Sequence, residues 1–469
     1  MGVLHDRFAA TARTHGGKPA LQIGSVTTTY ADLSVVADRI TADLTDAAAT
    51  TGCWIGLLWD RSPTAFAGLL AISRLGCAAV AVNAPEDARL KRLGVHAGLG
   101  PGGEVWRSGK PRGLRMDTAY VVATSGTTAD RKEVPVPDTG LTALLDHVRE
   151  TARFDSSDRV AVNYDPTFDP FYQVVGSAWQ VGACLVVPER REHLAIPWFV
   201  EQRAITAWDG VPSHARLTGR DPAPDRRLRT LRTVTFGGEP LNAALMRNWR
   251  ALAPAATLIN AYGPSETTVT AFECVVEPSS PVPAAANGTV PIGQPLPGVE
   301  HAVVGDGASG ELVIRGPQRF AGYLSDELNA GRFLSPGLES PVIGQSGPPA
   351  GDAWYRTGDL VTRHPEGLVH CGRIDEQVKL RGRRVDIAEV RHFVLERTGA
   401  MDAWVGVVAD RLVAVAECGK EHRPTSLELE GLPRAVPILQ VTQLPRLQNG
   451  KQDVVRLRAL ITSVWETVR

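Results

Sequence analysis

Short apolar runs followed by polar or glycine-rich turns recur up to about residue 278. The run at 233–236 leads into Gly237-Gly238-Glu239-Pro240 and then into an amphipathic stretch at 241–252. Similar runs occur at 120–123, 183–187 and 257–260. Strands that alternate with helices favour parallel sheets covered on both faces. Ligands of such sheets bind at the carboxyl ends of the strands, which is where these turns fall.

The pattern changes after Pro278, where proline and glycine become frequent. The apolar run at 311–314 predicts a strand of a small antiparallel unit. Two further runs, 404–409 and 412–417, are joined by Asp410-Arg411 and predict a hairpin. We therefore expect an α/β protein that ends in a compact α+β C-terminal domain.

Length and charge narrow the class of protein. The chain has 469 residues, too many for one ordinary domain, and 43% are hydrophobic and 22% charged, as in soluble globular proteins. The net charge of −1 argues against a general nucleic-acid-binding surface. The six cysteines form no C-x-x-C pair and predict buried thiols in a reducing compartment.

No segment has the pattern of a membrane anchor or a signal peptide. Residues 1–7 lack an apolar core, and Arg74 interrupts the apolar stretch at 65–82, which predicts a buried helix and a strand. We therefore expect a cytoplasmic protein with neither a membrane nor a nucleic acid as partner.

The first candidate for chemistry is a hydroxyl-rich loop after the strand expected at 120–123. Its residues are Thr124, Ser125, Gly126, Thr127 and Thr128, followed by Lys132. Backbone N–H groups and hydroxyls at such a loop can surround a phosphate, and the lysine adds charge. It is not a Walker A loop, and a loop of this kind on its own is more often a polar surface turn. Its assignment therefore depends on the other motifs.

Four further strings follow the loop in the order 260–268 (NAYGPSETT), 355–360 (YRTGDL), 372–382 (GRIDEQVKLRG) and the pair LPR and NGK at 444–451. Together with the loop they resemble the adenylate-forming superfamily, which contains acyl- and aryl-CoA ligases, luciferases and the adenylation domains of nonribosomal peptide synthetases. The resemblance runs from residue 28 to Lys451, and five ordered strings make chance very improbable. The strings at 260–266 and 372–382 are most similar to the peptide-synthetase branch.

The resemblance implies a fold with two parts. A large N-terminal domain at 1–374 would contain two helix-covered sheets and a small β-barrel-like unit, and would bind ATP and the amino acid. A small mobile domain at 375–469 would carry the catalytic Lys451 and move about a hinge at Asp375.

The resemblance also assigns the nucleotide-binding residues. The loop Thr124, Ser125, Gly126, Thr127, Thr128 and Lys132 would cover the β- and γ-phosphates. Tyr262 would stack on adenine, and Asp359 would accept hydrogen bonds from the ribose hydroxyls, with Arg373 nearby. The base would be bordered by Asn260, Gly237, Gly238 and Glu239. Glu266 would hold Mg²⁺, a hard cation suited to carboxylate and phosphate oxygens.

Lys451 is the residue expected to matter most for catalysis. In this chemistry the substrate carboxylate attacks the α-phosphorus and expels pyrophosphate, so no serine, cysteine or histidine nucleophile is needed. The transition state instead needs positive charge near the carboxylate and phosphoryl oxygens, which Lys451 and Mg²⁺ would supply. Thr127, Lys132 and Glu266 would complete the catalytic set.

The chain departs from the family pattern in the phosphate loop, at position 370 and in the segment between Pro85 and Tyr120, which is short. The phosphate loop of relatives usually ends in Gly-x-Pro-Lys-Gly, whereas this chain has Ala129-Asp130-Arg131-Lys132-Glu133. We expect slower loop movement and a share of the phosphate role for Arg131. His370 stands where an adenine-side tyrosine is common.

Asp169 lies where amino-acid-activating relatives bind the substrate α-ammonium group. A carboxylate in an apolar pocket is costly unless a cation neutralises it, although Asp-Pro is also turn chemistry. The other pocket positions are Pro170, Gln173, Asp209, Thr235, Gly237, Ala261, Val269 and Thr270. Our hypothesis is a basic, arginine- or lysine-like amino acid whose distal cation pairs with Asp209.

The residues after Lys451 are too few for a carrier domain, so we expect a free-standing enzyme that loads a separate phosphopantetheinylated carrier protein. Some relatives need a small MbtH-like helper protein, which the sequence does not decide.

Two alternatives stay open. One is an acyl- or aryl-CoA ligase, which Asp169 opposes. The other is a non-catalytic scaffold subunit, which Glu266, Asp359 and Lys451 oppose.

Overall fold

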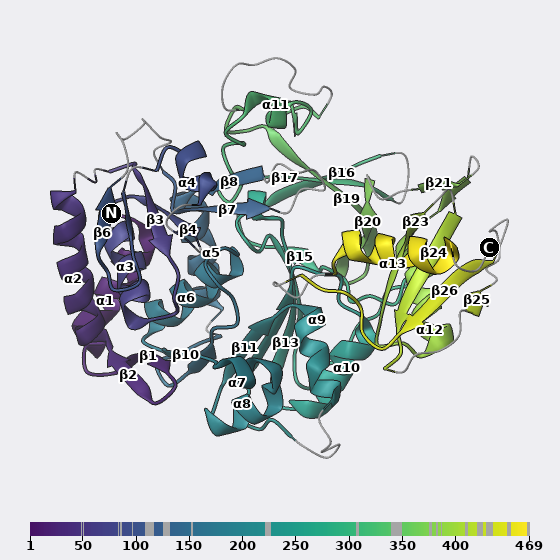
Figure 1. Cartoon of the computed structure of the whole chain (residues 1–469), viewed down its shortest axis with the longest axis horizontal. Helices are drawn as coiled ribbons and strands as arrows, with labels where there is room; N and C mark the ends of the chain where they lie inside the picture. Colours follow the sequence, from purple (N-terminus) through teal and green to yellow (C-terminus); the bar gives the residue numbers. More distant parts are fainter. Residues whose placement is uncertain are drawn as a thin grey trace.

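A computed structural model gives the fold of the chain (Figure 1). It describes residues 1–469 except 48, 50, 83, 85–86, 96, 108–116, 125–131, 152, 221–226, 306–308, 339–348, 375–377, 381–382, 386, 409–410, 420–424, 428–434, 448–451 and 467–469. The described residues form five sheets with helices packed on them, so the predicted α/β class is confirmed.

Two sheets are largely parallel, with antiparallel strands at their edges. In spatial order the nine-stranded sheet contains β15 (Gln294–Pro295), β14 (Phe272–Val276), β13 (Thr257–Tyr262), β12 (Thr233–Gly237), β11 (Ala207–Gly210), β9 (Arg159–Ala161), β10 (Cys184–Val187), β1 (Pro19–Ile23) and β2 (Val26–Thr29). The six-stranded sheet contains β6 (Val105–Arg107), β5 (Ala97–Leu99), β3 (Trp54–Leu58), β4 (Ala78–Val82), β7 (Tyr120–Thr124) and β8 (Lys132–Val136).

Several helices of this part of the chain begin at a capping side chain. The helices of this part are α1 (Val3–His15), α2 (Tyr30–Asp46), α3 (Pro63–Arg74), α4 (Ala88–Arg92), α5 (Asp138–Glu150), α6 (Pro170–Val181), α7 (Arg190–Leu194), α8 (Ile196–Gln202), α9 (Pro212–Ala215), η1 (Arg216–Arg220), α10 (Ala243–Leu252) and η2 (Ser265–Thr267). Thr29 and Asp32 form a capping box at α2, and Ser62 caps α3, which has Pro63 at its first position.

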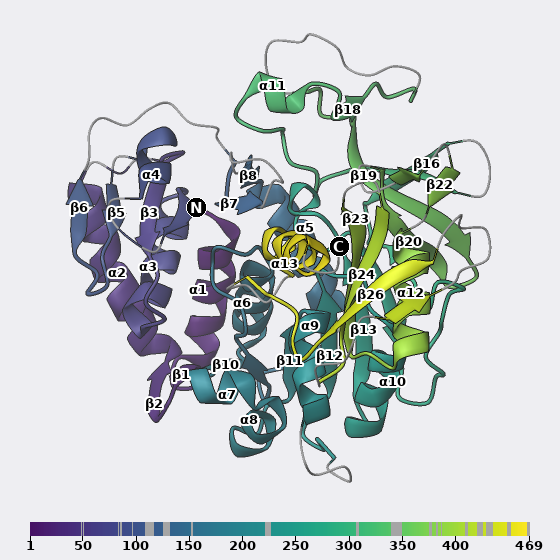
Figure 2. The same cartoon turned by 45° about the vertical axis from the view of Figure 1, so that its right-hand side comes forward.

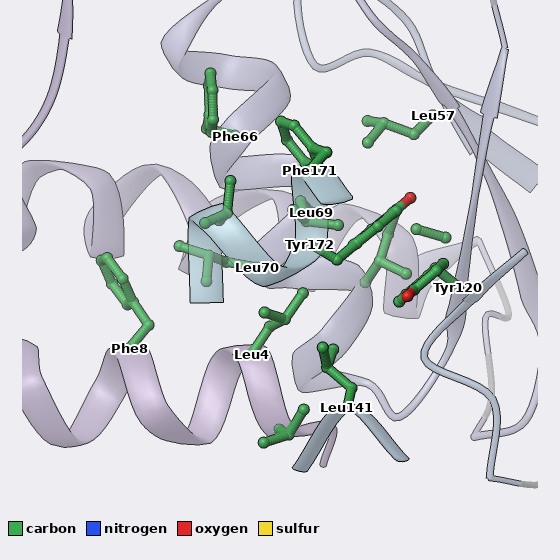
Figure 3. Close-up of a cluster of buried hydrophobic side chains, with 14 of the residues drawn as sticks. Leu4, Phe8, Leu57, Phe66, Leu69, Leu70, Tyr120, Leu141, Phe171 and Tyr172 are labelled. Carbon is green, nitrogen blue, oxygen red and sulfur yellow. The ribbon is translucent and has the colours of Figure 1, made fainter. Parts of the chain in front are cut away.

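One hydrophobic core joins the two parallel sheets through the helices between them. Leu4 and Phe8 of α1 face Leu70 of α3 and the aromatic residues of α6 (Figure 3). Tyr120 of β7 stacks on Tyr172 of α6 with ring centres 3.6 Å apart. Because both sheets share this core, α6 and the carboxyl end of β7 are held in fixed relation to each other.

A third unit is antiparallel. Its five strands are β16 (Glu300–Val304), β17 (Ser309–Arg315), β19 (Trp354–His364) and β18 (Phe333–Leu334), with β20 (Gly367–Arg373) on β19. The helix α11 (Asp326–Asn329) lies between β17 and β18 in the chain. A two-stranded sheet of β21 (Val378–Leu380) and β22 (Arg383–Val385) follows β20.

The last part of the chain, here called the C-terminal unit, contains the four-stranded sheet β23 (Asp402–Val408), β24 (Arg411–Glu417), β26 (Val436–Val441) and β25 (Thr425–Leu427) with α12 (Ile387–Thr398) and α13 (Val454–Glu466). Figure 2 shows α9 beside this unit, in agreement with the hydrogen bond from Arg216 to Asp402. The expected hinge, Asp375, lies outside the described residues.

The predicted elements are confirmed with small shifts. The helix expected at 241–252 begins at Ala243, because the Asn242 side chain accepts a hydrogen bond from the Ala244 N–H and caps it. The predicted hairpin is formed by β23 and β24, which pair antiparallel. The six cysteines are thiols without disulfide bonds. Within the described ranges, no helix is long and apolar enough to cross a membrane.

Candidate active site

The carboxylate of Asp359 is the centre of a polar cluster on β19. It accepts hydrogen bonds from Tyr262 Oη at 2.5 Å and from Arg373 Nη1 at 2.9 Å, and His370 Nε2 lies 3.5 Å away. Burial alone would raise the pKa of Asp359, but the contacts with His370, Tyr262 and Arg373 lower it below its ordinary value. The group is therefore an ionised acceptor, which suits the hydroxyls of a ribose. His370, noted as a departure from the family pattern, belongs to this cluster.

The turn expected beside adenine ends β12, next to β13. Gly238 has φ +77°, a left-handed conformation that favours glycine. Glu239 accepts hydrogen bonds from the Ser213 N–H and hydroxyl, both at 2.9 Å, so the turn is fixed to α9. Gly237 pairs with Ala261, one residue before Tyr262, and this register places the turn and Tyr262 at one end of the sheet.

Asn260, on β13 beside the turn, fixes the neighbouring backbone. Its side chain is buried, and Nδ2 donates to the backbone oxygens of Val290 and Pro291 at 3.2 and 2.8 Å. These bonds hold the segment after β14 against β13. The expected contact of Asn260 with the base stays a prediction.

The ends of the phosphate loop are closed by an antiparallel pair, Thr124 of β7 and Lys132 of β8. The loop residues Ser125, Gly126, Thr127 and Thr128 lie outside the described residues. Lys132 Nζ is 5.8 Å from the ring centre of Tyr323, and the Tyr323 hydroxyl donates to Glu266. The fold thus brings Lys132 and Glu266 to the same tyrosine.

Glu266 is a buried carboxylate in η2 and suits Mg²⁺ as a ligand. No group of three or more metal-ligating side chains occurs in the part of the chain that the structure describes. A single carboxylate fits Mg²⁺, because this ion commonly takes one or two protein carboxylates and completes its shell with phosphate oxygens and water. The residues present therefore fit the expected ion.

The segment after Glu266 is strained. Thr268 and Val269 have φ values of +55° and +63°, which β-branched residues rarely adopt. The buried Gln318 holds this conformation: its backbone oxygen accepts from the Thr268 hydroxyl at 2.7 Å, and its Nε2 donates to the Thr270 oxygen at 2.6 Å. Strain of this kind commonly occurs at functional sites. Here the strained segment follows Glu266, the predicted metal ligand, and includes Val269, which like Thr270 is a predicted pocket residue.

The expected substrate pocket begins at α6. Asp169 precedes this helix and is partly exposed, and Pro170 is its first residue. Burial and, to a smaller extent, the charge of Asp169 raise the pKa of Tyr120. Gln173 lies one turn further, and its Oε1 accepts a hydrogen bond from Thr270 at 2.9 Å. This bond joins the two walls of the pocket.

Asp209 of β11 lines a small cavity of ≈ 20 Å³ that Gln173 and Thr235 also line. Tyr164 Oη donates to its Oδ1 at 2.8 Å. Burial raises the pKa of Asp209 to about 7, since it outweighs the hydrogen bond from Tyr164, and the charge of Glu273 adds to the shift. Three of the predicted pocket positions therefore surround one cavity.

The same cavity has polar lining residues that sequence reasoning missed, and Arg153 and Ser177 are two of them. Arg153 donates to both oxygens of Glu273, at 2.9 and 2.6 Å, so its charge is matched within the pocket wall. Ser177 is 1% exposed. No local pattern marks either residue, because both reach the cavity only through the packing of α5 and α6 on the sheet.

Gly237 and Ala261 have small side chains and pair with each other on the neighbouring strands β12 and β13. A Cβ on Gly237 would lie 3.3 Å from the Ala261 backbone oxygen, so a larger residue there would push against β13.

Lys451 lies outside the described residues, as does Asp375. The structure therefore brings together the residues predicted to contact the ribose, the metal and the substrate, and these roles stay predictions, as do those of Lys451 and the hinge.

Comparison with known proteins identifies the class. The family model for AMP-binding enzymes matches residues 101–324. Novobiocin biosynthesis protein H of Streptomyces niveus is 30% identical over 460 residues, which cover 87% of this chain and 72% of that protein. The chain belongs to the AMP-binding enzyme family, and the predicted membership of the adenylate-forming superfamily is confirmed.

Within this family the chain is of the nonribosomal peptide synthetase adenylation type. It is 31% identical, over 95% of its length, to CymA of Salinispora arenicola, a probable non-canonical nonribosomal peptide synthetase. The crystal structure of IdnL7 matches with a TM-score of 0.80 and 29% identity, and the match covers 99% of both chains. The chain spans 6% of CymA and 7% of tyrocidine synthase 3 from Brevibacillus parabrevis, to which it is 28% identical over 96% of its own length.

Proposed function

We propose that this protein uses ATP to convert an amino acid into its aminoacyl-AMP, with release of pyrophosphate. The observation that carries the proposal is the ionised, buried Asp359 bound to Tyr262, together with Glu266 four residues after that tyrosine. A ribose acceptor and a metal-side carboxylate joined through one short segment suit a bound nucleoside triphosphate.

In the proposed reaction the substrate carboxylate oxygen forms a bond to the α-phosphorus, and the bond from that phosphorus to the pyrophosphate oxygen breaks. Glu266 would hold Mg²⁺, and the ion would supply positive charge that stabilises the leaving pyrophosphate. Asp359 holds the ribose, Lys132 faces the outer phosphates, and Lys451 stabilises the charge that develops at the reacting oxygens.

Hydroxylamine trapping tests this reaction. The purified chain, incubated with ATP, Mg²⁺, hydroxylamine and an accepted amino acid, should yield one aminoacyl hydroxamate per pyrophosphate released. Pyrophosphate release without hydroxamate would contradict an adenylate intermediate. An acid that lacks the amine should react far more slowly, and equal use of it would favour the acyl-CoA ligase alternative.

We further propose that the amino acid is basic. Asp209 is a carboxylate whose charged form is disfavoured by burial, and a cationic side chain beside it would restore that form. Asp169 would bind the α-ammonium group at the opposite end of the pocket. Replacing Asp209 by Ala should raise the KM of the basic amino acid far more than that of ATP. Equal use of neutral amino acids by the wild type would contradict the proposed specificity for basic amino acids.

The proposed second step passes the aminoacyl group to the phosphopantetheine thiol of a carrier protein. For this step the C-terminal unit would move about Asp375 and present residues 379–382 to the incoming thiol. Intact-protein mass spectrometry of a holo-carrier protein incubated with enzyme, ATP and amino acid measures the step. The expected result is a mass increase equal to the aminoacyl group, absent from a carrier whose modified serine is replaced by alanine.

A further inference from the structure

A buried cluster of charges joins the C-terminal unit to the rest of the protein. Asp402, at the start of β23, is 1% exposed, and its two oxygens accept hydrogen bonds from three arginines. Arg391 Nη2 and Arg446 Nη2, both from the C-terminal unit, donate at 2.6 Å. Arg216 Nη1 donates at 3.2 Å, and this residue begins η1 on the other side of the interface. One carboxylate therefore holds together two parts of the chain 186 residues apart.

Arg216 is rigidly placed on its own side. It directly follows Ala215, which is fully buried and whose backbone oxygen accepts hydrogen bonds from Trp249 Nε1 at 3.2 Å and from the Thr218 hydroxyl at 2.9 Å. The side chain of Arg216 is 14% exposed. Burial lowers the pKa of Arg216, whereas the charge of Asp402 opposes that effect. If Asp402 were absent, Arg216 would be a buried positive charge that has lost its hydration by water.

Asp402 also binds both flanks of the string that contains Lys451. Arg446 lies five residues before the lysine, and Gln452 directly follows it. Gln452 Nε2 donates to Asp402 Oδ2 at 3.1 Å and to the Ala403 oxygen at 3.2 Å. Arg446 and Gln452 form an antiparallel bridge with each other. The two ends of this segment are thus fixed to the same carboxylate that holds Arg216.

Next to this charge cluster, the two sides of the interface are not closely packed. A cavity of ≈ 140 Å³ is lined by Arg216 and Asn242 on one side and by Arg391 and His392 of α12 on the other. Close packing does occur at Gly288, where a Cβ would lie 2.3 Å from His392 Nδ1. Because this cavity lies between the two sides beside Arg216, the ion pair with Asp402 bridges them where the side chains are not closely packed.

We propose that Asp402 is a positioning residue, which docks the C-terminal unit on Arg216 and thereby sets where the segment containing Lys451 is delivered for adenylate formation. This inference rests on the proposed function. The contact favours the orientation of the C-terminal unit described here and must break when that unit rotates for thiol transfer. A buried, charge-assisted hydrogen bond corresponds to roughly a tenfold to hundredfold shift in the ratio of docked to undocked protein.

The test replaces Arg216 by Met in the full chain, because Asp402 then keeps Arg391, Arg446 and Gln452 and is not left without partners. Hydrogen–deuterium exchange should become faster at both faces of the interface, in η1 and in α12. The kcat of amino-acid-dependent pyrophosphate exchange should fall about tenfold or more, with the KM of ATP unchanged. The Arg216→Lys variant, which keeps the charge, should recover part of both effects.

Arg203→Met is the matched control. Arg203 donates from Nε to the buried Glu192 at 2.6 Å, with a side chain 22% exposed, and both partners lie on the same side of the interface. This variant should lower stability while leaving interface exchange and kcat close to wild type. Wild-type interface exchange in Arg216→Met, or an equal loss of kcat in Arg203→Met, would overturn the proposal. A wild type without pyrophosphate exchange would refute the proposed function alone, and hydrogen exchange would still decide whether Arg216 docks the unit.

Discussion

Arg89 Nε donates to both carboxylate oxygens of Glu133, at 3.0 and 2.9 Å. The same guanidinium donates to the backbone oxygens of Ala81 at 2.9 Å and Val121 at 3.1 Å, and both charged side chains are buried. Glu133 follows Lys132, where relatives usually have glycine. The glutamate that replaces the usual glycine therefore has an ion-pair partner on α4, Arg89. This pair holds the start of β8 in place.

Removing Arg89 should destabilise the protein strongly. In Arg89→Met the carboxylate of Glu133 stays buried, and among the described residues its remaining ion-pair partner is Arg92, whose side chain is 57% exposed. We therefore expect a loss of about 3 kcal/mol or more in the free energy of unfolding. Arg92→Met removes the exposed partner of the same carboxylate and should cost less than about 1 kcal/mol. Urea denaturation followed by tryptophan fluorescence measures both. Equal midpoints for the two variants would contradict this account of the pair.

Asp359→Asn should weaken ATP binding. The substitution keeps the size of the side chain but removes the charge that Arg373 and Tyr262 stabilise, and a hydrogen bond to a charged acceptor contributes about 1.5–3 kcal/mol. We therefore expect the Kd of a non-hydrolysable ATP analogue to rise about tenfold to hundredfold in calorimetry. Glu311→Gln, which removes the charge of another buried carboxylate on the neighbouring strand β17, is the control and should leave that Kd near wild type.

The use of a basic amino acid should depend on pH through Asp209. Its pKa is raised to about 7, so the free enzyme loses this negative charge as the pH falls below 7. An arginine-like side chain stays cationic over the whole range. We expect kcat/KM for the basic amino acid to rise between pH 6 and pH 8 and to level off above that. In Asp209→Asn the profile should lose this rise, and an unchanged profile would remove Asp209 from substrate recognition.

Lys451→Ala should reduce adenylate formation by about two orders of magnitude, as the loss of one charge-stabilising group can. The KM values of ATP and amino acid should change much less, because the lysine is proposed to act on the transition state. Lys91→Ala, a change at an exposed lysine of α4, is the control. Pyrophosphate release at a normal rate in the Lys451 variant would exclude the lysine from the mechanism.

Local patterns predicted much of the fold. The strand at 233–236 and the helix after it are separated by a Gly-Gly turn and by the capping Asn242, and each of these signals acts within a few residues. The hairpin of β23 and β24 likewise follows from two adjacent apolar runs. Elements of this kind are encoded by neighbours in sequence, which is why their bounds were predicted within about two residues.

The contacts that complete the site are of another kind. Tyr323 reaches Glu266, Arg153 reaches the Asp209 cavity, and Arg216 reaches Asp402 only after separate elements have packed together. The sequence around such a charged or aromatic residue does not predict which distant residue it will contact. The order of the family strings predicted Asp359 and Tyr262 as neighbours in function, whereas the 2.5 Å bond between them needed the structure.

Amino-acid-dependent exchange of labelled pyrophosphate into ATP tests the central claim most directly. The purified chain should be assayed with Mg²⁺ and each common amino acid, together with ornithine and cyclic arginine derivatives, and Asp359→Asn should serve as the impaired control. The account predicts exchange that requires an amino acid and is confined to basic ones. Exchange with no amino acid requirement, or none with any member of the panel in folded protein that binds ATP, would contradict it.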